Sequence, residues 1–319
     1  RDTRRRLRWL MVAALVMAAL NLRPAIAGLG PLLQEVREDI GMGGTVAGLL
    51  TSLPALCFAA FGSLLPRLVR RSGPVTVVLA GLVAITLGLG LRALAGDTVT
   101  FLAASVLALA GIAVSNVLMP VIVKEWFPRR VGTMTGVYSM AMALGTAGPA
   151  ALAVPVAQVL GDGDWRVGLG AWAVLAALAL PLWALLRRGH GRPGRPSDGD
   201  DRPSTGSTAD PRSRPLRLGR SGAAWSVAVY FGLQSTAAYA VMGWLPQIFR
   251  DAGVSPTTAG ALLATTMGLG VPLSFVLPDI AARVSHQGPV AATLGVAGLL
   301  GYAGLWLAPA GGAWAWAVL

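Results

Sequence analysis

Residues 30–38, GPLLQEVRE, have a counterpart 213 residues further along the chain, where residues 243–251 read GWLPQIFRD. The two segments share a glycine, a glutamine and an arginine, and the match extends beyond them at an offset of 212. The matched pairs include Gly30 with Gly243, Gln34 with Gln247, Arg37 with Arg250, Pro66 with Pro278 and Arg71 with Arg283. Similarity at a nearly fixed spacing indicates an internal repeat. We therefore predict two homologous halves.

The composition is that of a membrane protein. Of the 319 residues, 55% are hydrophobic and 13% are charged, and the mean hydropathy is +0.65. A typical soluble domain has about 25% charged residues. The single cysteine, Cys57, lies in an apolar run, so neither a disulfide framework nor a cysteine metal cluster is expected. We predict an all-α protein that crosses the bilayer many times.

The spans follow from the length of apolar sequence that the hydrocarbon core requires, about 20 residues. Charge-poor segments of this length lie near 9–33, 45–66, 74–92, 99–122, 131–157, 167–186, 221–249, 257–278 and 288–308, and a tenth begins at AWAWAVL, residues 313–319. This pattern predicts nine complete helices and the start of another. If both halves have six helices, about two and a half lie beyond residue 319.

The connections between the spans differ in charge. The amino terminus and the connections near 67–73, 124–130, 187–220 and 279–287 hold 21 Lys and Arg residues, whereas those near 34–44, 92–98, 158–166 and 250–256 hold 4. By the positive-inside rule, the first set is cytoplasmic. The formal net charge of +12 therefore reports orientation. Binding of nucleic acid is not expected, because no basic patch interleaved with aromatic residues accompanies the charge.

The spans and the repeat together predict the domain organisation. Residues 1–186 form a six-helix half, residues 187–220 a flexible cytoplasmic linker rich in Gly, Pro and Ser, and residues 221–319 an incomplete second half. Both copies of the repeat begin on the cytoplasmic side, so they are parallel repeats. Transporters built in this way bind their substrate near the bilayer midplane, between the halves.

Three segments resemble a known family: NLRPAIAGLGPLL at 21–33, LLPRLVRRSG at 64–73 and VKEWFPRRVGTMTG at 123–136. With the six-helix halves and the long linker, they resemble the major facilitator superfamily, and within it the cyanate and nitroimidazole permeases. The resemblance implies a 6+6 helix architecture and transport by alternating access. The wider superfamily has an acidic residue before the arginine of the loop after helix 2, where this chain has Pro66.

Because of Pro66, the carboxylate interaction of that loop motif is not carried over to this chain. The remaining arginines of the loop are Arg67, Arg70 and Arg71. We interpret them as orientation signals and as contacts to neighbouring helix ends.

Arg23 lies near the middle of the first span, directly before Pro24. A centred arginine costs from about 2.5 to about 17 kcal/mol, depending on the method, and its guanidinium remains charged. Every Asp and Glu of the sequence falls in a predicted loop or at a helix end. We therefore expect a bound anionic or strongly dipolar solute to supply the missing negative charge. The alternatives are an acid beyond residue 319 and backbone carbonyls, including that of Leu20, which Pro24 frees.

Other polar residues lie at similar depths in the predicted helices. The offset of the repeat places Asn21 opposite Gln234, and two amides at one depth would suit a polar site, although amides also connect neighbouring helices. Asn116, Tyr138, Ser139 and Tyr239 are further candidates for contact with the solute, with simple packing as the alternative.

The predicted function is a secondary active permease of the inner (cytoplasmic) membrane. An exporter of neutral or cationic drugs is the alternative. A membrane enzyme or receptor is disfavoured, because no nucleophile and base pair and no metal-ligand cluster is found, and His190 and His286 both lie in predicted cytoplasmic loops. We expect a monomer in the lipid bilayer, with a small-molecule substrate and neither cofactor nor metal.

Overall fold

The computed structural model describes residues 2–189, 221–283 and 288–318, and within these ranges it contains helices and no strands. Residues 2–189 are called here the first half and residues 221–318 the second half. The elements of the first half are α1 (Asp2–Leu20), α2 (Pro24–Ala27), the 3₁₀ helix η1 (Gly30–Leu32), α3 (Leu33–Asp39), α4 (Gly44–Ser72), α5 (Pro74–Ala93), α6 (Thr98–Trp126), α7 (Val131–Gly161) and α8 (Trp165–Gly189). Those of the second half are α9 (Gly222–Asp251), α10 (Pro256–Arg283), α11 (Gly288–Leu307) and α12 (Ala313–Val318). Most of the predicted linker lies outside the described residues.

Six helical segments of the described chain are long and apolar enough to cross a membrane. They are Arg6–Asp39, Gly44–Ser72, Pro74–Ala93, Thr98–Trp126, Val131–Gly161 and Trp165–Arg188. They coincide with the first six predicted spans. The helices are longer than the apolar runs, because a helix continues through its charged last turns after it leaves the hydrocarbon.

The loop predicted at 67–73 is a clear case of such an extension. Residues 67–72 continue α4, and Arg67, Arg70 and Arg71 are exposed on its last turns. Positive side chains are favourable at the C-terminal end of a helix, where the carbonyl groups carry a partial negative charge. These arginines therefore belong to a helix end, which corrects the prediction of a loop.

The first span is also not one continuous helix, which corrects the prediction for 9–33. The α1 helix ends at Leu20, and residues 21–23 form a turn before α2. Pro24 has no amide hydrogen to donate, and the amides of Ile26 and Ala27 both donate to the carbonyl of Arg23 over 3.0 Å. A second proline, Pro31, lies in η1.

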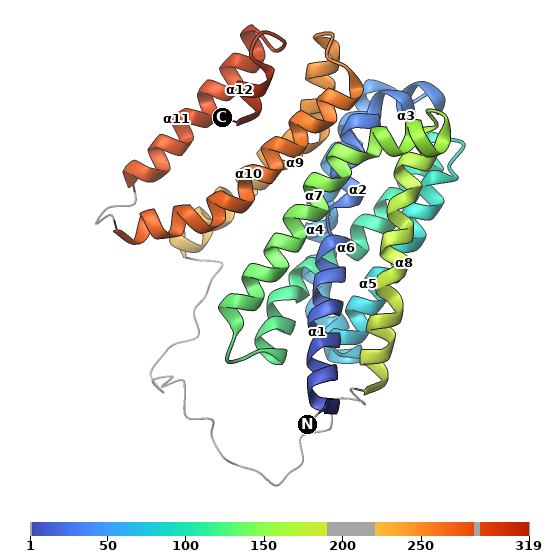
Figure 1. Ribbon diagram of the computed structural model, residues 1–319, viewed down its shortest axis with the longest axis vertical. Helices are drawn as coiled ribbons and strands as arrows, with labels where there is room; N and C mark the ends of the chain where they lie inside the picture. Colours follow the sequence, from blue (N-terminus) through green and yellow to red (C-terminus); the bar gives the residue numbers. More distant parts are fainter. Residues whose placement is uncertain (1, 190–220, 284–287, 319) are drawn as a thin grey trace.

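At the end of the molecule where α3 lies, called here the α3 end, several contacts join the halves. Arg250 of α9 forms an ion pair of 2.7 Å with Glu35 and donates to the carbonyl of Pro31 over 3.0 Å. Trp244 donates to the hydroxyl of Thr51 over 3.1 Å. Toward the opposite end, which carries the N-terminus, α10 lies farther from α7 (Figure 1). Residues 228–237 of α9 are exposed there.

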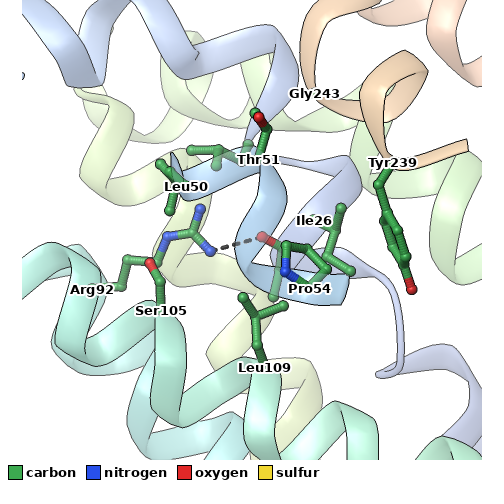
Figure 2. Close-up of a pocket in the computed structure, with 11 residues that line it drawn as sticks. Ile26, Leu50, Thr51, Pro54, Arg92, Ser105, Leu109, Tyr239 and Gly243 are labelled. Atoms are coloured by element: carbon green, nitrogen blue, oxygen red, sulfur yellow. Dashed lines mark hydrogen bonds between the residues drawn. The ribbon is translucent and has the colours of Figure 1, made fainter. Parts of the chain in front are cut away.

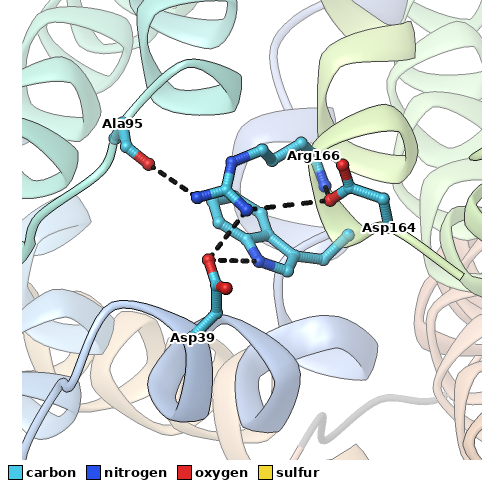
Figure 3. Close-up of polar contacts among 5 residues, drawn as sticks. Asp39, Ala95, Asp164 and Arg166 are labelled. Carbon is cyan, nitrogen blue, oxygen red and sulfur yellow. Dashed lines mark hydrogen bonds and ion pairs between the residues drawn. The ribbon is translucent and has the colours of Figure 1, made fainter.

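Arg166 holds α3 in place within the first half (Figure 3). Its guanidinium pairs with Asp39 over 2.8 Å, donates to the carbonyl of Ala95 over 3.2 Å, and lies 4.4 Å from the ring centre of Trp165. The indole of Trp165 also donates to Asp39, over 3.2 Å. These contacts attach α3 to the start of α8 and to the connection between α5 and α6.

Candidate solute site at the break in helix 1

Arg23 lies in the break between α1 and α2, with its side chain half-buried. Its Nη1 donates a hydrogen bond of 3.3 Å to the hydroxyl of Tyr239 in α9, and its guanidinium lies 5.8 Å from the centre of that ring. Phe58 packs against the ring of Tyr239, with 6.3 Å between the ring centres. A contact between residues 216 positions apart thus joins the two halves at the break.

A cavity of about 430 Å³ adjoins Arg23. Its walls come from the helix break, α7, α9 and α10, so that both halves contribute. The lining residues are Arg23, Thr135, Gly136, Ser139, Met140, Met142, Ala143, Thr146, Met242, Met267, Gly270 and Val271. Of these residues, Arg23 alone is charged, and four others are methionines.

The backbone around the break brings α7 close to Arg23. The carbonyl of Leu20, which Pro24 leaves without its usual helical donor, lies against Gly145 of α7, where an added Cβ would overlap it. In the described part of the chain, the hydrogen bond of Arg23 goes to Tyr239 and not to this carbonyl. The predicted alternative in which Arg23 satisfies Leu20 is therefore not what the structure shows.

The positive charge of Arg23 has no carboxylate partner among the residues that the structure describes. The ion pairs found there are Arg166 with Asp39 and Asp164, and Arg250 with Glu35, all at the α3 end. A guanidinium has five N–H donors, of which one bonds Tyr239. The side chain therefore presents an unbalanced charge and free donor capacity to the cavity.

Asn21 is buried in a different contact from Arg23. Its Nδ2 donates to the carbonyl of Met17 over 2.8 Å and to that of Leu175 in α8 over 3.3 Å. Gln234 is exposed on α9. The structure thus does not bring the two predicted amides into one site. Asn21 instead connects neighbouring helices, which was the alternative interpretation.

The remaining candidates lie at different distances from the cavity. Ser139 lines the cavity. Tyr239 does not line it, but its hydroxyl is bonded to Arg23, which does. Tyr138 is half-buried and packs against the core of the first half, and Asn116 is half-buried in α6.

Arg92 is a buried cation that the sequence interpretation missed. It was assigned to the outer connection 92–98, but it lies in the last turn of α5 with 1% of its surface exposed. Its Nη1 donates to the carbonyl of Ala25 over 2.7 Å, and its guanidinium lies 4.8 Å from the ring centre of Phe101. The amide of Leu29 bonds the carbonyl of Ile26, which leaves that of Ala25 available. Apolar residues on both sides of Arg92, in GLGLRALAG, were the signal for burial.

A protein with several membrane-spanning helices, and with a cavity walled by two halves at a broken helix, has the architecture of a solute carrier. The chain belongs to the Major Facilitator Superfamily, whose family model matches residues 8–319. It is therefore a multi-pass membrane protein and a secondary active permease for a small molecule, as predicted.

Similar proteins include three bacterial transporters. The chain is 32% identical to "Uncharacterized transporter YycB" of Bacillus subtilis (strain 168), over 93% of this chain and 70% of the relative. It is 31% identical to the "2-nitroimidazole transporter" of Escherichia coli (strain K12), over 95% of this chain and 73% of the relative. It is 30% identical to the "Cyanate transport protein CynX" of the same organism, over 93% and 73%.

Two solved structures show the same fold. A D-xylose–proton symporter superposes with a TM-score of 0.67 at 14% identity, covering 97% of this chain and 77% of the symporter. A bacterial homologue of the human lysosomal transporter Spinster superposes with a TM-score of 0.73 at 18% identity, covering 97% and 72%. Both share the helix arrangement over nearly the whole of this chain.

Proposed function

We propose that the chain carries a small anionic or strongly dipolar solute by alternating access, and that Arg23 binds the negative group of the solute. The observation that carries this proposal is the unbalanced guanidinium at the cavity between the halves. In a site of low dielectric constant, a fixed positive charge attracts an anion far more strongly than it would in water. Two oxygens on the solute would allow a bidentate contact.

The size of the cavity favours a solute with a body as well as a charge. A volume of about 430 Å³ lies within the usual range of small-molecule sites and exceeds what a triatomic anion fills. The flexible thioethers of Met140, Met142, Met242 and Met267 can adapt to an apolar or aromatic group. Two of the similar transporters are named for cyanate, an anion, and for 2-nitroimidazole, a ring with a dipolar nitro group.

The orientation belongs to the same proposal. By the positive-inside rule, the excess of basic residues supports a cytoplasmic position for the amino terminus and the linker. Contacts then close the outer, α3 end of the halves, so that this conformation faces the cytoplasm. We propose that the protein acts as a monomer in the cytoplasmic membrane and performs no chemical conversion of its solute.

Export of cationic compounds is the second candidate. It is disfavoured because the charged residue that lines the cavity is positive. A cation would pay an electrostatic penalty beside Arg23 that no described carboxylate offsets.

The test is uptake into proteoliposomes by the full-length protein, with cyanate, benzoate, 2-nitroimidazole and the cation tetraphenylphosphonium as solutes. We expect uptake of one or more of the first three, loss in Arg23→Ala, and strong impairment in Arg23→Lys, because an ammonium cannot reproduce the planar fork. Arg67→Lys, an exposed arginine on α4, is the matched control. Wild-type uptake by a folded Arg23→Ala protein, or uptake of the cation alone, would overturn the proposal.

A further inference from the structure

Arg92 is buried more completely than its structural contacts explain. Its Nη1 bonds the carbonyl of Ala25, but its Nε and Nη2 are buried without a hydrogen-bond partner among the described residues. None of the described ion pairs includes it. Buried polar groups nearly always have partners. A positive charge with unused donors in the protein interior therefore points to a ligand that binds there in another conformation of the transporter.

Arg92 lines a small cavity between the halves. Its volume is about 20 Å³, enough for about one water molecule. Figure 2 shows Arg92 on one side of it and Tyr239 on the other, with Thr51, Pro54 and Ser105 also on its walls.

The second half contributes Tyr239 and Gly243 to these walls, and the first half contributes the rest. Gly243 lies close to Thr51, where an added Cβ would meet the methyl group of Thr51 at 2.6 Å. The cavity therefore widens whenever α9 moves away from α4.

Tyr239 connects this cavity with Arg23, which lines the larger one. Its ring forms a wall of the small cavity, and its hydroxyl, which points away from that cavity in Figure 2, accepts the hydrogen bond from Arg23. Ala25, to which Arg92 is bonded, follows Arg23 by two residues toward the α3 end. Tyr239 thus contacts Arg23 through its hydroxyl and lines, with its ring, the cavity that Arg92 also lines.

A purely structural role explains only part of this arrangement. The bond to Ala25 satisfies a carbonyl of the short helix α2. One bound water would satisfy one further donor. Neither contact balances the charge.

We propose that Arg92 is a second binding position for the negative group of the solute, on the α3 side of Tyr239. The inference rests on the proposed function of Arg23. When the halves separate at the α3 end, the cavity opens, the free Nε and Nη2 of Arg92 bind the anion, and the anion then moves past Tyr239 to Arg23. In the conformation described here, residues of both halves lie close together around this position.

The first experiment measures the field of Arg92 directly and does not depend on transport. Ser105→Cys, in a Cys57→Ala background, places a thiol on the wall of the small cavity. The full-length protein in membranes is treated from the α3 side with an anionic and with a cationic methanethiosulfonate reagent. We expect the anionic reagent to react at least tenfold faster, Arg92→Gln to abolish this preference, and Arg23→Ala to leave it. If Arg92→Gln kept the wild-type preference for the anionic reagent, or if neither reagent reacted, the proposal would be overturned.

The second experiment uses Arg92→Lys, which keeps the charge and the ability to bond Ala25 but lacks the fork. The probes are cyanate and 2-nitroimidazole, with uptake measured in vesicles of both orientations. We expect the KM from the α3 side to rise about tenfold while that from the N-terminal side changes less than twofold. Arg166→Lys is the matched control, because Arg166 also donates to a carbonyl, that of Ala95, at the α3 end.

The outcomes separate this inference from the proposed function. An unchanged KM in Arg92→Lys with impaired uptake in Arg23→Lys would exclude Arg92 as a binding position and keep Arg23 as the solute site. Wild-type uptake in Arg23→Ala, with the reagent preference still dependent on Arg92, would exclude Arg23 as the solute site and keep Arg92 as an anion-binding position.

Discussion

The guanidinium of Arg23 in the first half donates a hydrogen bond of 3.3 Å to the hydroxyl of Tyr239 in the second half. The donor is at a helix break and the acceptor is in the middle of α9, so the bond joins two bodies that alternating access must move apart. It also occupies one of the donors that a bound anion would use. The bond therefore competes with the proposed solute.

Replacement of Tyr239 by phenylalanine tests this competition. The ring that packs against Phe58 remains, while the acceptor for Arg23 is lost. Because the bond is long, its net contribution is about 0.5–1 kcal/mol, and we expect the KM for the anion to fall about two- to fivefold. Tyr138→Phe, at a half-buried tyrosine of α7 that is not among the residues lining either cavity, is the control. A higher KM in Tyr239→Phe would show that the hydroxyl contacts the solute itself.

Asn21→Ala distinguishes a helix contact from a solute contact. The amide connects α1 to the carbonyl of Leu175 in α8, and hydrogen bonds between membrane helices contribute about 0.6 kcal/mol on average. We expect a small decrease in the thermal unfolding temperature and a KM within twofold of the wild-type value. A tenfold rise in KM with unchanged stability would return Asn21 to the solute site.

Gly145→Ala tests the close approach of α7 to the break. An added Cβ would overlap the carbonyl of Leu20, so the two helices must move apart. Overpacking of this kind costs about 1–3 kcal/mol, which thermal unfolding in detergent would detect. Gly148→Ala, on the same helix with open space around the added Cβ, is the matched control and should leave stability unchanged. Equal stability of both variants would contradict the described packing.

Removal of the ion pair at the α3 end should favour the opposite conformation. Glu35 and Arg250 are partly exposed, with 32% and 11% of their side-chain surfaces accessible, so the pair contributes about 1 kcal/mol or less. We expect Glu35→Gln to speed the labelling of Ser105→Cys up to about fivefold. Arg250→Gln should have a larger effect, because it also loses the bond to Pro31.

Glu38→Gln is the control for this experiment, because Glu38 bonds Gln34 within α3 and not the second half. Slower labelling in Glu35→Gln would contradict a role of the ion pair in holding the α3 end closed.

The repeat was readable from the sequence, but the different uses of its two copies were not. Gln34 bonds Glu38 and Gln247 bonds Asp251, four residues apart in each copy, so the local contact is repeated. Arg250 reaches across to Glu35, whereas Arg37 bonds the carbonyl of Met42 in its own half. The difference depends on which surfaces meet when the halves pack.

The sequence by itself determined the first six membrane spans and singled out Arg23. The thickness of the hydrocarbon core sets the length of an apolar run, and a charge in such a run is visible without any knowledge of its neighbours. Pro24 likewise predicted a kink in the first span, but the sequence did not show that the helix would break over residues 21–23.

Only the tertiary structure decided which side chains meet. Asn21 and Arg23 are two residues apart, yet one contacts α8 and the other α9. Arg92 belongs to the last turn of α5 and turns inward to Ala25, 67 positions away in the chain. The physical reason is that hydropathy and helical period describe one helix at a time, whereas contacts between helices depend on how several helices pack together. The break before Pro24 and the close approach of α7 at Gly145 are part of that packing.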